Sequence, residues 1–146
     1  MPMPARTIAR MWHPWRALRS LLDIDVIWTE RLPSGVLGAT DGAKIWMTPR
    51  QLQAERRCTL THELIHIERG HIGCQLPAIE AEVCEEAARR LIPLDDLVHA
   101  VIWGQSPDEV ADELWVDLDT LMTRLNILTD REHRALSNAL AERDGW

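Results

Sequence analysis

Two histidines four residues apart, with a glutamate directly after the first, are the residues of this chain best suited to chemistry. Residues 62–66 read H-E-L-I-H. In an α-helix, His62 and His66 lie on one face, one turn apart, and can bind a single metal ion. Glu63 is rotated by about 100° from His62, so it faces the open side of such an ion. The spacing predicts a zinc site at which Glu63 is the general base.

The flanking residues predict that this motif lies in a long buried helix. No proline interrupts residues 52–69. The apolar residues Leu60, Leu64 and Ile67 repeat at spacings of four and three, which is typical of a buried helical stripe. Gly70 is suited to the left-handed conformation that ends a helix.

The longer metzincin pattern, H-E-x-x-H-x-x-G-x-x-H, is not present. It requires glycine at position 69 and histidine at position 72, where this chain has Arg69 and Ile72. We therefore expect His71 to be a solvated loop histidine rather than the third metal ligand.

A second helix is expected over residues 79–92, ended by Pro93. Its apolar residues recur every four positions, at 79, 83, 87 and 91, and its glutamates stand at 80, 82, 85 and 86. Most of these carboxylates should be solvated, but a metal ion can draw one inward at the edge of the apolar stripe. By geometry alone, Glu82 and Glu86 are nearly equivalent candidates for the third ligand.

Residues 56–93 resemble the ImmA/IrrE family of small metallopeptidases. Members of that family have a basic, threonine-containing segment before H-E-x-x-H, as residues 57–61 do here. They also have a helix in which a glutamate precedes the proline of a Leu-Met-Pro-like end by eleven residues, as Glu82 precedes Pro93. The resemblance implies that Glu82 is the third zinc ligand, with Glu86 as the alternative.

The same resemblance implies a function and a partner. It implies a zinc-dependent endopeptidase whose protein substrate is a helix-turn-helix transcriptional repressor of a phage or mobile element. His62, His66 and Glu82 would hold Zn²⁺, and Glu63 would take the proton from the attacking water. The alternative is a non-catalytic, zinc-stabilised module that binds the repressor and displaces it.

The residues before the motif predict a small sheet. Residues 25–29, 35–40 and 44–47 are rich in Val, Ile, Trp and Thr, and Asp41-Gly42 is a hairpin signal. We expect an α+β fold in which a small antiparallel three-stranded sheet packs on the H-E-x-x-H helix. A further hypothesis is that strand 44–47 is an edge strand that holds extended substrate. A sheet that only covers the helix is equally compatible with the sequence.

The chain after Pro93 is expected to be helical. Residues 94–103 form one helix, and Ser106-Pro107 is a typical helix start. Short helices on either side of a break at 116–117 suggest a helix-turn-helix-like tail. Residues 106–120 contain six acidic residues and no Lys or Arg, so this tail should repel nucleic acid. We expect a metallopeptidase core over residues 1–103 and a helical tail over 104–146 that supports the core or meets a protein partner.

Composition is that of an ordinary globular protein. The chain has 146 residues, of which 46% are apolar, and a net charge of −7. It contains no apolar stretch long enough for a membrane span, and its three cysteines follow no C-x-x-C spacing. We expect a soluble, cytoplasmic protein with Cys84 as a buried structural thiol and a packed N-terminal helix within residues 6–19.

Overall fold

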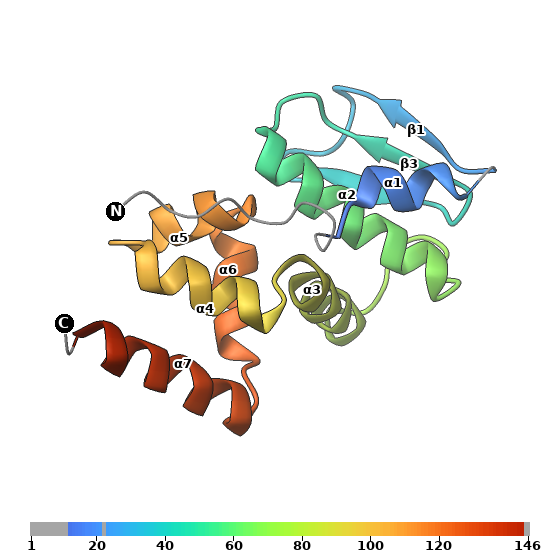
Figure 1. The fold of residues 1–146 in the computed structure, drawn as a ribbon. Helices are drawn as coiled ribbons and strands as arrows, with labels where there is room; N and C mark the ends of the chain where they lie inside the picture. Colours follow the sequence, from blue (N-terminus) through green and yellow to red (C-terminus); the bar gives the residue numbers. More distant parts are fainter. Residues whose placement is uncertain (1–11, 22, 145–146) are drawn as a thin grey trace.

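The computed structural model describes residues 12–21 and 23–144, which contain three strands and seven helices. The strands are β1 (Asp25–Trp28), β2 (Gly38–Thr40) and β3 (Lys44–Met47). The helices are α1 (Pro14–Arg19), α2 (Gln53–Glu68), α3 (Pro77–Leu91), α4 (Leu94–Trp103), α5 (Pro107–Leu114), α6 (Leu118–Asn126) and α7 (Asp130–Asp144). In Figure 1, the sheet with α1 and α2 lies at one end of the molecule and α4 to α7 at the other. The predicted α+β class is confirmed.

The sheet is mixed, with the strand order β1-β3-β2. The β2 and β3 strands pair in the antiparallel sense through the predicted Asp41-Gly42 turn, in which Gly42 has a φ of 93°. The β1 strand pairs with β3 in the parallel sense. The prediction of an antiparallel sheet is therefore wrong, because residues 29–37 carry the chain from one edge of the sheet to the other and do not form a tight turn between neighbouring strands.

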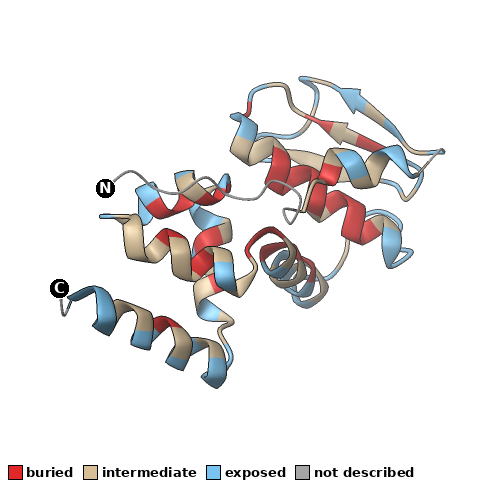
Figure 2. Ribbon diagram, in the orientation of Figure 1, coloured by how far each residue is buried: buried red, intermediate tan, exposed pale blue. Residues whose placement is uncertain are grey.

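The α2 helix, which contains the H-E-x-x-H motif, is buried on more than one side. Two of its leucines form an apolar cluster with residues of β3: Leu60, Leu64, Ile45 and Met47. On another side it forms a cluster with α3: Ile65, Val83 and Ala87. Figure 2 shows buried residues along most of α2. The motif is thus held in a helix that is fixed from several directions.

The C-terminal helices share one apolar core with the end of α3 and with Cys58 of α2: Leu91, Leu97, Leu114, Leu121 and Leu136 are among its members. The buried guanidinium group of Arg57 adds polar contacts. It donates to the carbonyl oxygens of Leu114 and Trp115 at 3.2 and 3.0 Å, and to that of Trp12 at 2.9 Å. The predicted tail therefore contacts the helix that contains the motif.

Most helix boundaries lie close to their predicted positions. Ser106 caps α5 by accepting from the backbone N–H of Glu109, as its place before Pro107 predicts. In the N-terminal segment, residues 14–19 are helical, and residues 6–11 of the predicted helix lie outside the described residues. No helix in the described part of the chain is both long and apolar enough to cross a membrane.

Candidate metal centre

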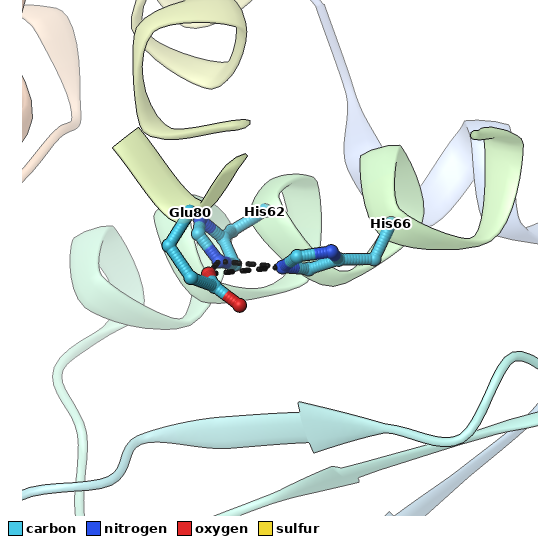
Figure 3. A group of neighbouring side chains, drawn as sticks. All are labelled: His62, His66 and Glu80. Atoms are coloured by element: carbon cyan, nitrogen blue, oxygen red, sulfur yellow. Dashed lines mark hydrogen bonds and ion pairs between the residues drawn. The ribbon is translucent and has the colours of Figure 1, made fainter. Parts of the chain in front are cut away.

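Three side chains from two helices converge on one point. His62 and His66 come from α2, and Glu80 comes from α3 (Figure 3). The Nε2 atoms of the two histidines are 3.1 Å apart, and Glu80 Oε2 lies 3.0 Å from His62 Nε2 and 3.1 Å from His66 Nε2. The two helices therefore bring two imidazole nitrogens and one carboxylate oxygen together as a group that could hold a metal ion.

The donor set and its spacing fit a zinc ion. Two histidines and one glutamate are a known ligand set of catalytic zinc sites. Around a tetrahedral zinc ion with ligands at about 2.1 Å, the ligand atoms lie about 3.4 Å apart. The three donor atoms need to separate by only a few tenths of an ångström from their present 3.0–3.1 Å to reach that spacing.

The structure does not bring Glu82 or Glu86 to the histidines. Glu82 is largely exposed, and its Oε2 lies 3.8 Å from Arg69 Nη1. Glu86 accepts from Arg90 at 3.0 Å, and Arg90 also pairs with Glu68. Both predicted candidates thus lie on a flank of α3 where arginines neutralise them. Glu80 replaces them in the candidate ligand set.

The packing of α3 turns Glu80, and not Glu82 or Glu86, toward the histidines. The predicted apolar stripe omits Ala88, which is fully buried. Glu80, Cys84 and Ala88 follow one another at intervals of four, so they lie along one side of the helix. The sequence contained a signal against Glu86 only: Arg90 stands four residues after Glu86 and offers it a partner, whereas no basic residue stands four positions from either Glu80 or Glu82.

Glu63 is the buried carboxylate of the site. Only 6% of its surface is exposed, and it does not belong to the three-residue ligand group. Burial, and then the negative charge of Glu80, raises the pKa of Glu63 to about 7. A carboxyl group with a pKa near neutrality can both accept and return a proton, which is the property that a general base of a hydrolase needs.

A cleft of about 420 Å³ opens beside His62 and Glu63. It lies between the segment that enters β2 and the three helices α2, α3 and α6. Its lining residues are Gly35, Val36, Leu37, Gly38, Cys58, Thr59, His62, Glu63, Cys84, Ala87, Asp117, Asp119, Thr120 and Thr123. These include three carboxylates and no Lys or Arg. One wall of the cleft therefore comes from the predicted tail, through the acidic start of α6.

The opposite wall of the cleft is fixed to α2 by a small polar network. The buried amide of Gln51 donates to the carbonyl oxygens of Leu37 and Thr48 at 3.2 and 2.9 Å. Its Oε1 accepts from the hydroxyl of Thr59 at 2.7 Å. Gly38 follows directly, and a Cβ atom at this position would lie 2.5 Å from Thr59 Cγ2 and 3.4 Å from Glu63 Cγ. Glycine is thus what lets β2 approach the helix next to Glu63.

The nitrogen of His62 on the far side from Glu80 faces a cysteine. Cys84 Sγ lies 3.6 Å from His62 Nδ1, and Cys84 is exposed on the cleft. The prediction that Cys84 is a buried structural thiol is therefore wrong. Although the residue is exposed, the thiol is partly desolvated by its neighbours; this desolvation, followed by the charge of Glu80, raises the pKa of Cys84, so the thiol stays protonated. Burial and His66 lower the pKa of His62, which favours the neutral imidazole that binds metal.

His71 is also placed differently from its prediction as a solvated residue. It is half-buried, and its Nδ1 lies 3.0 Å from Nδ1 of His66. It does not belong to the metal-binding group. Its ring nitrogen instead contacts His66, a candidate ligand.

In comparisons with known proteins, no family model, no curated protein and no solved structure matches this chain. The function of this protein is therefore inferred from the geometry of the site.

Proposed function

We propose that this protein is a zinc-dependent endopeptidase in which His62, His66 and Glu80 hold the metal and Glu63 is the general base. One observation carries the proposal: a buried carboxylate that is not a member of the ligand group lines a cleft directly beside that group. A purely structural zinc site is normally closed by four protein ligands. Among the described residues the group has three, so a fourth position is left for water or substrate, as in catalytic sites.

The chain's own residues supply the proton transfers. Zinc bound in this group would supply a water of lowered pKa and an electrophile for the peptide carbonyl. Glu63 takes a proton from the attacking water and delivers it to the nitrogen of the leaving amine. In the metal-free protein, burial raises the pKa of Glu63 to about 7, so this carboxyl group can exchange a proton near neutral pH.

The exposed edge of the sheet at the cleft is β2, and this strand is the better candidate for holding substrate. The hypothesis that strand 44–47 is an edge strand is wrong, because β3 is paired on both sides. The β2 strand pairs with β3 on one side only, and Gly38 lines the cleft. An extended peptide paired with β2 would pass beside Glu63.

The proposed substrate is a helix-turn-helix repressor, as the resemblance to ImmA/IrrE peptidases implies. The surface charge is compatible with a protein partner and unfavourable for nucleic acid. Asp117 and Asp119 on the cleft wall, together with the acidic residues of α5, would repel phosphate groups. A basic segment of a DNA-binding protein is attracted to such a wall.

The experiment that tests the proposal compares Glu63→Gln with the wild-type protein. Both are loaded with zinc and incubated with a peptide library made by digesting a bacterial proteome, and new termini are identified by mass spectrometry. We expect cleavage by wild type, loss of at least about 100-fold of the activity in Glu63→Gln, and equal zinc content in the two. Glu82→Gln is the matched control and should cleave normally.

Two outcomes would contradict the proposal. Equal cleavage by Glu63→Gln and by the wild type would show that Glu63 is not the general base. Absence of cleavage by the zinc-loaded wild type, combined with tight binding of an intact repressor, would favour the non-catalytic repressor-binding module instead.

A further inference from the structure

The second ring nitrogen of the candidate ligand His66 has its own partner. Nδ1 of His66 lies 3.0 Å from Nδ1 of His71, and the two ring centroids are 5.2 Å apart at an angle of 60°. The other nitrogen of His66, Nε2, points at His62 and Glu80. His66 is 4% exposed, so the bond to His71 is made where water does not readily replace it.

The end of α2 brings His71 to this position. Gly70 has a φ of 70°, a left-handed conformation that turns the chain back on the helix. The backbone N–H of Gly70 donates to the carbonyl oxygen of Ile67 at 3.0 Å, and that of His71 donates to the carbonyl oxygen of His66 at 2.9 Å. This pair of bonds is the Schellman motif, which commonly places the residue after the glycine against the residue five positions earlier.

The loop that contains His71 also lies close to the turn of the β2–β3 hairpin. A Cβ atom added at Gly42, in the turn between β2 and β3, would lie 3.4 Å from the carbonyl oxygen of His71. The backbone of residue 71 is therefore bonded to the helix end and lies close to the hairpin turn. Its side chain can be replaced without removing either contact.

Metal binding fixes the direction of the bond between the two histidines. An imidazole that binds a metal through Nε2 carries its ring proton on Nδ1 and must donate it. His71 Nδ1 is the atom that can accept this proton. A partner of this kind fixes the tautomer and the orientation of the ring and increases its basicity as a ligand.

We propose that His71 is a positioning residue of the metal centre, which accepts the Nδ1 proton of His66 and so holds His66 Nε2 toward the ion. The inference rests on the proposed metal site of His62, His66 and Glu80. Gly70 and His71 would then contribute to metal affinity in addition to ending α2.

The test measures zinc affinity by competition with a chromophoric chelator, for the wild type and three variants. His71→Ala should bind zinc about 10- to 100-fold more weakly than the wild type, the range found when outer partners of metal ligands are removed. His71→Asn should restore most of the affinity, because its Oδ1 is an acceptor at nearly the position of the imidazole Nδ1. His133→Ala removes an exposed histidine from α7 and should bind zinc like the wild type.

A second readout reports on the bond directly. In the zinc-loaded, ¹⁵N-labelled protein, we expect a slowly exchanging Nδ1 proton on His66 and a coupling across the hydrogen bond to Nδ1 of His71. Both signals should be absent in His71→Ala, and circular dichroism would verify that the variant is folded.

The possible failures are distinguishable. Equal zinc affinity in wild type and His71→Ala would overturn the role of His71 and leave the metal centre intact. Equal loss in His71→Asn and His71→Ala would show that the imidazole acts in some way other than as an acceptor, which also overturns the inference. Failure of the wild type to bind zinc would overturn the centre itself. Zinc binding that depends on His71, without any peptide cleavage, would overturn only the proposed activity.

Discussion

Replacing Gly38 with alanine should destabilise the protein through one identified contact. The new Cβ would lie 2.5 Å from Thr59 Cγ2, whereas carbon atoms in contact are about 3.5–4.0 Å apart. Thr59 cannot rotate away freely, because its hydroxyl donates to Gln51 Oε1 at 2.7 Å. The strand must therefore move from the helix by about 1 Å, in the range of overpacking that costs about 1–3 kcal/mol.

A smaller effect acts in the opposite direction. Replacing glycine with alanine reduces the entropy of the unfolded chain and stabilises the folded state by about 0.4–1 kcal/mol. We therefore expect a net loss of about 1–2 kcal/mol for Gly38→Ala. Urea denaturation of the metal-free protein, followed by tryptophan fluorescence, measures this loss.

The double variant identifies the contact. Thr59→Ser removes Cγ2 and keeps the hydroxyl that bonds to Gln51. In the Thr59→Ser background, Gly38→Ala should cost less than about 0.5 kcal/mol, which gives a coupling energy of about 1 kcal/mol between the two sites. A coupling energy near zero, or a Gly38→Ala protein as stable as the wild type, would refute the close approach of β2 to α2 and with it the wall of the cleft.

Three further predictions concern buried charges. An elevation of the Glu63 pKa from 4.5 to about 7 corresponds to a cost of up to about 3 kcal/mol in the metal-free protein. The protonated carboxyl of Glu63 makes its full contribution to stability below pH 4.5. This contribution is lost as the pH rises through about 7. Metal-free Glu63→Gln should therefore be more stable than the wild type at pH 8 and not at pH 4.5, and equal pH profiles in urea denaturation would contradict this. Arg57→Met removes the donor to the carbonyls of Leu114, Trp115 and Trp12 and should cost about 3 kcal/mol; a loss below 1 kcal/mol in thermal denaturation would count against that network. Arg124 lowers the pKa of Glu132, so the stability from this pair is present above the ordinary pKa of 4.5 and is lost as the pH falls through the lowered value. Glu132→Gln should therefore be less stable than the wild type at pH 7, and the difference should shrink in acid; a difference that stays constant down to pH 3 would exclude the ion pair as its source.

Local signals in the sequence predicted the elements well. The H-E-x-x-H spacing, the uninterrupted run before it and Gly70 place α2 correctly, and Ser106-Pro107 marks the start of α5. These features act within one or two helical turns, where residue type and spacing largely determine the conformation. The Asp41-Gly42 turn likewise fixes the β2–β3 hairpin.

Features that depend on how elements meet were not predicted. Whether Glu80 or Glu82 faces the histidines depends on the rotation of α3 about its axis, which buries Ala88 and leaves Glu82 and Glu86 beside Arg69 and Arg90. The parallel pairing of β1 with β3 depends on the path of residues 29–37, which contain no signal for crossing the sheet. The position of His71 was predictable from a local signal, because the Schellman motif that Gly70 predicts places the next residue against His66.

The identity of the third ligand is tested most directly by measuring zinc affinity in two matched variants, Glu80→Gln and Glu82→Gln. Both changes remove one negative charge from α3, two residues apart, and keep the size of the side chain. We predict that the wild type and Glu82→Gln bind one zinc ion with equal affinity and that Glu80→Gln binds it at least about 100-fold more weakly, a larger effect than outer partners contribute. Normal zinc binding by Glu80→Gln, with the loss in Glu82→Gln instead, would contradict the metal centre described for this protein.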